Sequence, residues 1–299
     1  MTLNVGIIGF GQVGQTIASV LASHHAVKVS DLNRTACEQH PLVSARKVSL
    51  AGSATELAGS VDVLLFCLPT PNASRAVSEE IVGHIRPGLL VLETSTVAPE
   101  DVFRLRDLLE PAGANVVDTA VIGGIKALSE GKAVFLVGAP EEHASSTDTI
   151  LRHLAAEIFY FGKLGGGMRA KIVANAVSHS VYVVLAESLA VAAAQEIPMD
   201  VMCRLLARES GMIRPLTHRI NERLLQDNFA GGMSTANARK DSHLFLETAS
   251  KLNVPVFASQ AAHTVYEIAS GEGMAANDYA IVAKLWEKWA GISYTGGRA

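Results

Sequence analysis

The feature that most constrains the fold is a glycine string near the N-terminus, Gly9-Phe10-Gly11-Gln12-Val13-Gly14. A short apolar run precedes it and a helical period follows, so the string joins a buried strand to a helix. Gly9 would permit a tight turn, Gly11 would let the backbone approach a phosphate, and Gly14 would let helix and strand pack closely. Because a helix N-terminus attracts anions, the string predicts a dinucleotide site that uses all six residues.

The second expected strand ends at Asp31, at about the spacing of the acid that binds a ribose in such sites. A carboxylate there accepts hydrogen bonds from both ribose hydroxyls of NAD and repels the additional phosphate of NADP. We therefore favour NAD as the cofactor, with Asp31 and Leu32 as contacts. Arg34 leaves NADP open, because an arginine at this place could bind that phosphate.

The first half of the chain alternates apolar, β-branched runs with helical stretches, which predicts a mostly parallel sheet covered on both faces. We expect strands at Asn4–Gly9, Val27–Asp31, Val61–Cys67, Leu89–Glu93, Asn115–Thr119, Val134–Val137 and Ile158–Phe161.

After about Gly162 the strand signals end and long helical periods replace them. The expected helices are Met168–Gln195, Pro198–Ala207, Pro215–Gln226, Ser242–Leu252, Pro255–Ser270 and Ala280–Trp289. The triplet Gly165-Gly166-Gly167 is typical of a hinge. We therefore expect an α/β domain over residues 1–162 and an all-helical domain over residues 163–299.

Composition narrows the function classes. The formal net charge is −4 and no long basic run occurs, which argues against nucleic acid and anionic membranes as partners. The three cysteines, Cys37, Cys67 and Cys203, are widely spaced, and we expect them to be reduced thiols. No cluster of His, Cys and Asp residues has the sequence spacing of metal ligands. The N-terminus runs directly into the first strand without the pattern of a signal peptide, so we expect a cytoplasmic protein.

The most apolar stretch, Ile172 to Ala194, is long enough to raise the question of a membrane span. It contains Asn175, His179 and Glu187, and a buried helix of a soluble protein explains these polar residues better. Its apolar surface is large for one small domain. We therefore expect a homodimer or homotetramer that forms through the helical domain.

Four ordered segments give the chain a resemblance to the β-hydroxyacid dehydrogenases, the group that contains 3-hydroxyisobutyrate dehydrogenase and tartronate semialdehyde reductase and is related to 6-phosphogluconate dehydrogenase. The segments cover nearly the whole chain. They are the glycine string, the run Asp118-Thr119-Ala120-Val121-Ile122-Gly123-Gly124, the run Gly162 to Asn175 with Lys171 inside it, and Lys240-Asp241 with the later Gly271-Glu272-Gly273 and Asp278.

The resemblance implies a Rossmann-like domain that binds NAD(P), followed by an all-α domain, and the exchange of a hydride with a small carboxylate substrate. Lys171 would be the catalytic lysine. The resemblance implies substrate contacts at Ile122, Gly123, Gly124, Asn175 and Lys240, and further cofactor contacts at Leu68, Pro69, Thr96 and Lys240.

The residue types suit this chemistry. A lysine ammonium can stabilise charge on a carbonyl oxygen during reduction and then donate the proton, and a neutral amine can take that proton in oxidation. The second role requires a lowered pKa, for which burial against the apolar helix or a second cation at Lys240 would suffice. Lys171 and Asn175 are four residues apart and face one side of a helix. His179 continues that face, but a lone histidine on an apolar helix is more typical of the interior, and Lys240-Asp241 could be a surface ion pair.

The chain departs from the family pattern at one substrate position. Ile122 stands where the family usually has a serine, so only the adjacent backbone N–H groups remain to bind a carboxylate. Two alternatives therefore stay open: the reduction of an imine or of a carbonyl without a carboxylate, and a regulator that binds the cofactor without turnover. Retention of Lys171 argues against the first alternative, because related imine reductases generally lack this lysine.

Overall fold

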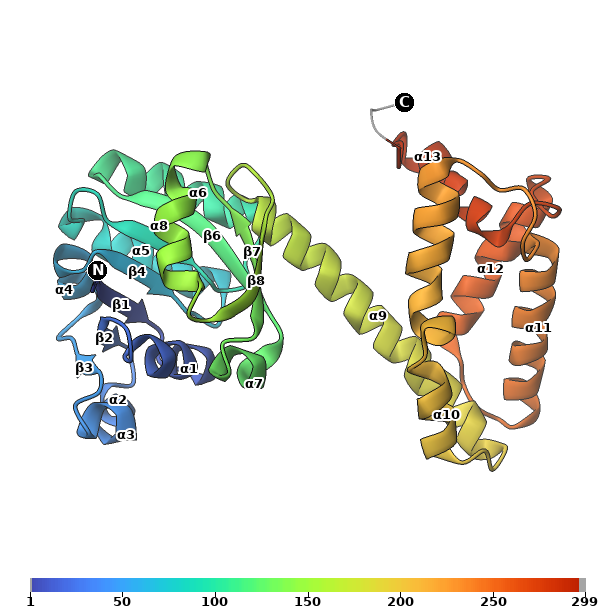
Figure 1. Cartoon of the computed structure of the whole chain (residues 1–299), viewed down its shortest axis with the longest axis horizontal. Helices are drawn as coiled ribbons and strands as arrows, with labels where there is room; N and C mark the ends of the chain where they lie inside the picture. The colour runs from blue at the N-terminus through green and yellow to red at the C-terminus, as the bar shows by residue number, and fades with distance from the viewer. Residues whose placement is uncertain (1, 296–299) are drawn as a thin grey trace. The chain divides into compact units, whose positions relative to one another are not determined.

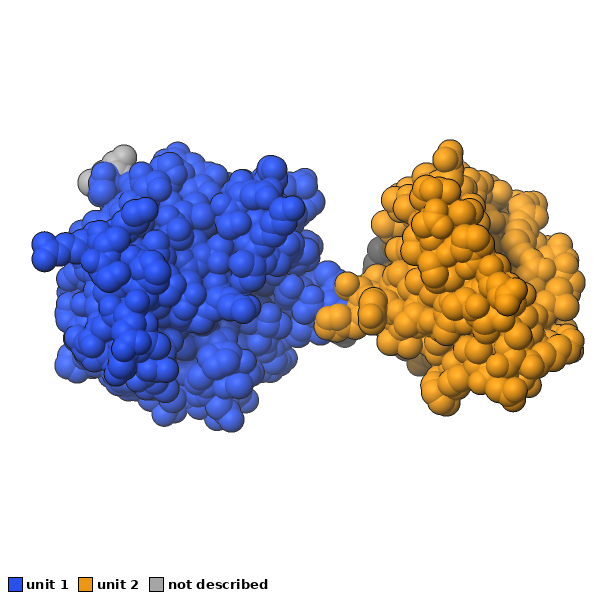
Figure 2. Space-filling view, turned by 90° about the horizontal axis from the view of Figure 1, so that it is seen from below, with its two compact units in different colours: residues 1–176 blue, residues 177–299 orange. Residues whose placement is uncertain are grey.

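The computed structural model describes residues 2–295 and divides the chain into two compact units, residues 1–176 and residues 177–299 (Figure 2). The division falls inside the long helix α9, Gly166–Ala194, and so lies later than Gly162. The physical reason is that the first turns of α9 pack on the sheet of the first unit, where Met168 is fully buried.

An eight-stranded sheet forms the centre of the first unit, in the order β3-β2-β1-β4-β5-β6-β7-β8 (Figure 1). All neighbouring strands are parallel except β6 and β7. The strand order reverses between β1 and β4, and ligands of such sheets bind at this point. The strands are β1 Asn4–Ile8, β2 Ala26–Ser30, β3 Ser49–Leu50, β4 Val63–Phe66, β5 Leu90–Glu93, β6 Asn115–Ile122, β7 Ala133–Gly138 and β8 Ala155–Tyr160.

Two separate cores cover the two faces of this sheet, because successive side chains of a strand point to opposite sides. Ile7 belongs to the core that contains α1 and α8, whereas its neighbour Ile8 belongs to the core that contains α4 and α6. The α-helices are α1 Gln12–Leu21, α2 Arg34–Gln39, α3 Pro41–Ser44, α4 Ala54–Ser60, α5 Pro71–Ile81, α6 Pro99–Leu109, α7 Gly124–Ser129 and α8 Glu141–Leu151. The expected parallel α/β architecture is confirmed. The short strand β3 was not expected.

One buried carboxylate fastens the start of α9 to the sheet. Asp118, on β6, is fully buried and accepts hydrogen bonds from the backbone N–H of Gly165 at 2.6 Å and of Met168 at 2.7 Å. Burial raises the pKa of this carboxyl to about 6, and the backbone donors oppose that increase. Asp118 thereby occupies N–H groups at the helix start that have no partner within the helix.

Glycines allow the helix start to approach the sheet this closely. A Cβ atom on Gly167 would lie 2.2 Å from the carbonyl oxygen of Leu136, and one on Gly138 would lie 2.3 Å from the Asp118 carboxylate. Gly166 is equally constrained, since its Cβ would lie 2.5 Å from the carbonyl oxygen of Phe161. The glycine triplet, which the sequence suggested as a hinge, therefore forms a close-packed contact between the start of α9 and the sheet.

The second unit is helical in its described residues. It consists of the remainder of α9, α10 Met199–Leu206, π-helical turns at Glu209–Ile213 and Pro215–Arg223, α11 Thr235–Lys251, α12 Phe257–Gly271 and α13 Ala283–Ala290, with short 3₁₀ turns at Leu224–Gln226 and Tyr279–Val282. Glu187 of α9 is buried and accepts from the backbone N–H of Ala258 at 2.8 Å and of Ser259 at 3.0 Å. This carboxylate therefore binds the N-terminus of α12, where a negative charge is favourable.

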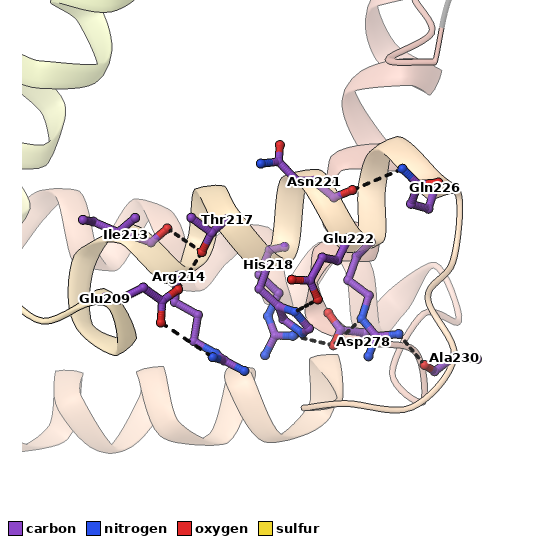
Figure 3. A network of polar contacts seen from close by, with 12 residues as sticks. Glu209, Ile213, Arg214, Thr217, His218, Asn221, Glu222, Gln226, Ala230 and Asp278 are labelled. Carbon is purple, nitrogen blue, oxygen red and sulfur yellow. Dashed lines mark hydrogen bonds and ion pairs between the residues drawn. The ribbon is translucent and has the colours of Figure 1, made fainter.

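A polar network joins the π-helical turns to the last part of the chain (Figure 3). Arg219 donates to the fully buried carboxylate of Asp278 at 2.9 Å, and its guanidinium lies 4.3 Å from the ring centre of Tyr279. Arg223 donates to the carbonyl oxygen of Ala230 at 2.8 Å. These contacts give the late Asp278 a structural role within the second unit.

Two of the expected helices differ from those observed. The helix expected at Ser242–Leu252 begins earlier, at Thr235, because the Ser234 side chain accepts a hydrogen bond from Asn237 N and caps that end. The segment Pro215–Arg223 winds as a π-helix, which a pattern of apolar residues does not distinguish from an α-helix.

The long apolar helix is largely exposed within the single chain. Only 17% of its most apolar window is buried, and among the described residues α9 is the one helix whose length and composition would suit a membrane span. His179, expected in the interior, is exposed. Val177 is 58% exposed and Tyr182 is 71% exposed. A single chain therefore leaves a long apolar helix surface uncovered.

We predict that Gly167→Ala destabilises the protein by about 1–3 kcal/mol, because the new methyl group must displace the Leu136 carbonyl and the start of α9. Thermal or denaturant unfolding measures the change. Gly83→Ala is the matched control, since nothing lies within 4 Å of a Cβ atom there. Equal stability of the two variants would contradict the close packing at this joint.

Candidate functional site

The glycine string forms the turn between β1 and α1, and each glycine has a distinct environment. Gly9 has a φ of +94°, and a Cβ atom there would lie 2.3 Å from the carbonyl oxygen of Cys67. A Cβ atom on Gly14 would lie 2.0 Å from the carbonyl oxygen of Gly9, whereas nothing lies within 4 Å of one on Gly11. Gly11 is thus open on its outer side, next to the N-terminus of α1. This arrangement fits the pyrophosphate of a dinucleotide.

Asp31 lies directly after β2 and is bonded to the glycine turn. Its carboxylate accepts from the backbone N–H of Phe10 at 2.6 Å and of Asn33 at 2.9 Å. The Phe10 side chain is buried in the core, so this residue contributes to the site through its backbone. Leu32 is fully exposed. The sequence-predicted residues of the ribose site are therefore together at one end of β1 and β2.

The Arg34 guanidinium is engaged by neighbouring groups. It donates to Glu38 at 3.0 Å and to the carbonyl oxygens of Ala51 at 3.0 Å and Gly52 at 3.4 Å. These three acceptors engage Nε and Nη1 of the guanidinium and hold it against the Ala51–Gly52 segment. Gln12 and Val13, the other residues of the string, form the first turn of α1.

Lys171 lies on α9, close to the segment that the sequence suggested for substrate. Its Nζ donates to the carbonyl oxygen of Val121 at 2.8 Å, and Val121 directly precedes Ile122 at the end of β6. The side chain is half-buried, and burial lowers the pKa of its amine. Asp118 binds the N–H of Met168, one helical turn before Lys171, so a single strand holds both the helix start and the amine. Lys171 is thereby fixed relative to β6.

The segment after Val121 turns sharply into α7. Gly123 has a φ of +117° and Gly124 has a φ of +70°, a region in which a side chain would be strained. Both glycines are exposed, while Ile122 is half-buried against the core on the α4–α6 side. Asn175 follows Lys171 by one turn and is half-buried. The structure therefore brings Lys171 together with the Ile122–Gly124 turn.

A third part of the site consists of the residues after β4 and β5. Leu68 donates its backbone N–H to Ser95 Oγ at 2.9 Å, and Ser95 N donates to Glu93 at 2.9 Å. Pro69 and Thr96 are exposed beside these residues. Burial raises the pKa of the Glu93 carboxyl to about 7, while bonds from Ser74 and Ser95 lower it.

Sequence reasoning did not assign a role to Glu93 or to the anchoring carboxylate of Asp118. A carboxylate at the end of an apolar strand is the one local signal that could have pointed to Glu93. Lys240 lies in the second unit on α11, where its ammonium is exposed and pairs with Asp241 at 3.0 Å. Within residues 2–295, no group of His, Cys, Asp and Glu side chains is arranged to hold a metal ion.

Two family models match successive parts of the chain. Residues 4–162 match the NAD binding domain of 6-phosphogluconate dehydrogenase. Residues 165–286 match the family described as the NAD-binding domain of NADP-dependent 3-hydroxyisobutyrate dehydrogenase. The two matches together cover most of the chain.

Curated relatives match over nearly their full length at low identity. The chain is 24% identical to 2-(hydroxymethyl)glutarate dehydrogenase of Eubacterium barkeri, with 99% of each chain covered. It is 26% identical to the NAD-dependent L-serine dehydrogenase of Pseudomonas aeruginosa, covering 96% of this chain and 99% of that one.

Solved structures have the same fold. A Mycobacterium tuberculosis 3-hydroxyisobutyrate dehydrogenase with L-serine matches with a TM-score of 0.64 at 23% identity, covering 95% of this chain and 99% of that one. An imine reductase from Pseudomonas sp. matches with a TM-score of 0.86 at 17% identity, with the same coverage. With both domains matched in order, the chain belongs to the β-hydroxyacid dehydrogenases of the 3-hydroxyisobutyrate dehydrogenase type, a family of NAD(P)-dependent oxidoreductases.

Proposed function

We propose that this protein interconverts a small β-hydroxy acid and its aldehyde or ketone, with Lys171 as the group that transfers the proton. The observation that carries the proposal is the half-buried Lys171 amine, held 2.8 Å from the Val121 carbonyl oxygen beside the Ile122–Gly124 turn. Relatives of this chain act on hydroxy acids by name, at 24% and 26% identity, which supports the reaction class.

The Val121 carbonyl accepts one hydrogen of the Lys171 amine and orients the rest of that group. The ammonium form can donate a proton to a substrate oxygen that gains negative charge, and the neutral form can remove a hydroxyl proton in the reverse direction. Burial favours the neutral form, which lowers the pKa and makes the reverse direction accessible nearer neutral pH. When bound, the nicotinamide cofactor supplies or accepts the hydride.

Substrate binding would use the turn after β6. Gly123 and Gly124 are exposed, and their backbone N–H groups are available to a carboxylate beside Lys171. Asn175, on the same helix face as Lys171, would add a side-chain amide, as the family resemblance implies. Ile122 adds no hydrogen bond, so recognition of the carboxylate rests on the backbone.

Ile122 also supports a second candidate reaction, the reduction of an imine or of a carbonyl that has no carboxylate. An apolar side chain at this place favours an uncharged group over a carboxylate, because it offers no polar partner for a desolvated charge. Lys171 weighs against this candidate, since the reduction of a cationic imine gains nothing from a nearby ammonium.

We predict that Lys171→Ala lowers kcat by about 10²–10⁴-fold, the usual contribution of a positioned acid or base. The measurement is NAD or NADP reduction against a panel of β-hydroxy acids, with cofactor affinity determined separately. Lys163→Ala is the control, because Lys163 is an exposed lysine of the same segment. In the wild type, kcat for oxidation should rise with pH towards a pKa below the usual lysine value.

Three results would count against the proposal. Full activity of Lys171→Ala would remove the assigned proton transfer. Turnover of imines or neutral ketones, with none of hydroxy acids, would favour the second candidate. Cofactor binding without turnover of either panel would identify a regulator that binds the dinucleotide.

We propose NAD as the preferred cofactor, because the Asp31 carboxylate lies at the ribose position and the Arg34 guanidinium is already bonded to Glu38 and to carbonyl oxygens. Asp31→Ser should shift the ratio of kcat/KM for NADP to that for NAD by at least about tenfold towards NADP, since it removes a charge that repels the phosphate. Glu38→Gln is the comparison variant. A wild type that prefers NADP would contradict the assignment.

We further propose that a second copy of the chain covers the exposed apolar side of α9, giving a homodimer or homotetramer in the cytoplasm. Light scattering should give two or four times the mass of one chain, and Val177→Glu should reduce it. Ser146→Glu, at an exposed polar position of α8 in the first unit, is the control. A monomer at working concentration, or a wild type that requires detergent, would contradict this proposal.

A further inference from the structure

The Glu93 side chain connects strand β5, helix α5 and the segment that contains Ser95, near the candidate cofactor site. It is the last residue of β5 and only 1% exposed. Ser74 Oγ, from α5, donates to one carboxylate oxygen, and Ser95 N donates to the other at 2.9 Å. Both oxygens are therefore used, and both partners belong to segments that surround the site.

Ser95 also forms hydrogen bonds with the end of strand β4 and the residues that follow it. Its hydroxyl accepts from Leu68 N at 2.9 Å and donates to the carbonyl oxygen of Phe66 at 3.3 Å. Leu68 in turn lies against the glycine turn, since a Cβ atom on Gly9 would be 3.3 Å from Leu68 Cδ2. A continuous series of contacts thus connects the buried Glu93 carboxyl, through Ser95 and Leu68, with the glycine turn.

The groups that face Glu93 leave its charge uncompensated. Cys67, after β4, is a neighbour whose thiol pKa is raised by burial and by the Glu93 charge. Asp101, on α6, raises the pKa of Glu93, and the guanidinium of Arg75 on α5 lies 3.8 Å from Asp101. Among residues 2–295, no cationic side chain forms a salt bridge with Glu93. The bonds from Ser74 and Ser95 are thus its main polar contacts.

We propose that Glu93 is a positioning residue for the cofactor: its ionised carboxylate, through Ser95, holds the Leu68–Pro69 segment in the conformation that binds the nicotinamide end of the dinucleotide. The assignment of that end of the cofactor to Leu68–Pro69 rests on the proposed function. Glu93 acts through Ser95 and needs no contact with cofactor or substrate.

The two protonation states of Glu93 differ in how firmly they hold Ser95. A carboxylate accepts two charge-assisted hydrogen bonds, which are roughly twice as strong as neutral ones. A protonated carboxyl accepts a weaker hydrogen bond from Ser95 N, and its own O–H can donate to the Ser74 hydroxyl instead of accepting from it. Because the pKa of Glu93 is raised to about 7, both states are populated near neutral pH. A cofactor that binds the ionised state better must displace a proton, by linkage.

The test measures NADH binding by nicotinamide fluorescence and calorimetry in the full chain, without a second substrate. For the wild type we expect the Kd to fall about three- to tenfold between pH 6 and pH 8. We also expect proton release on binding, seen as a dependence of the heat on the buffer near pH 7. Glu93→Gln keeps both hydrogen-bond partners but cannot ionise, so its Kd should not change with pH and no proton should be released.

Two further variants and a control complete the design. Glu93→Ala and Ser95→Ala should weaken binding about tenfold or more at both pH values, because Leu68 N loses its fixed partner. Glu80→Gln, an exposed carboxylate of α5, should behave as the wild type. If Glu93→Ala does not fold, Ser95→Ala and Glu93→Gln still decide the question.

Some results would contradict the positioning role of Glu93, and others would contradict the proposed function. A wild-type pH dependence and proton release in Glu93→Gln, or wild-type affinity in Ser95→Ala, would overturn the positioning role. A wild type that does not bind NADH would overturn this role together with the proposed function. Loss of turnover on every hydroxy acid, with the binding results as expected, would overturn the proposed reaction alone.

Discussion

The hydrogen bonds that the Asp118 carboxylate accepts from the backbone N–H groups of Gly165 and Met168 are the contacts on which the rest of the first unit's site depends. They join the middle of β6 to the start of α9, and they lie in a fully buried place that water cannot reach. The same strand continues to the Val121 carbonyl and then to the Gly123–Gly124 turn. One strand therefore orients the helix, the amine of Lys171 and the turn beside it, which removes most of the freedom that the lysine side chain would otherwise have.

Buried carboxylates recur as organising groups in this chain. Asp118 binds the start of α9, Glu187 binds the start of α12, and Asp278 binds Arg219. Glu93 differs in its partners, because it binds a serine hydroxyl and a serine backbone N–H rather than a helix start or a guanidinium. Burial raises the pKa of Glu93 to about 7 and that of Asp118 to about 6, so of these two carboxyls Glu93 changes its protonation state nearer to neutral pH.

The sequence was sufficient for the architecture and for the residues that lie in local motifs. The glycine string, Asp31 and Lys171 were found from strand–turn–helix context and family resemblance, and the parallel sheet followed from alternating patterns. The partners of Asp118 and Glu93 could not be found in this way. Met168 is fifty residues from Asp118, and such pairs depend on the tertiary fold rather than on spacing.

Two other features, the exposure of α9 and the start of α11, could not be derived from the sequence pattern, and the physical reasons are clear. An apolar helix pattern predicts that a surface is covered, without saying by which chain, and α9 is largely exposed within the single chain. The helix α11 begins before the expected Ser242, because the cap at Ser234 and the polar first turns already form the helix. Side-chain capping, rather than periodicity, sets that boundary.

The bond between Asp31 and Phe10 has a consequence for how this enzyme family can diversify. The carboxylate that would discriminate between cofactors also satisfies the backbone N–H of Phe10 at 2.6 Å, inside the turn that we expect to bind the pyrophosphate. A lineage that exchanges Asp31 for a residue tolerant of phosphate loses a bond of the turn in the same step. A change of cofactor along this route therefore weakens the turn, and neutral drift at Asp31 alone is restricted by folding as well as by cofactor choice.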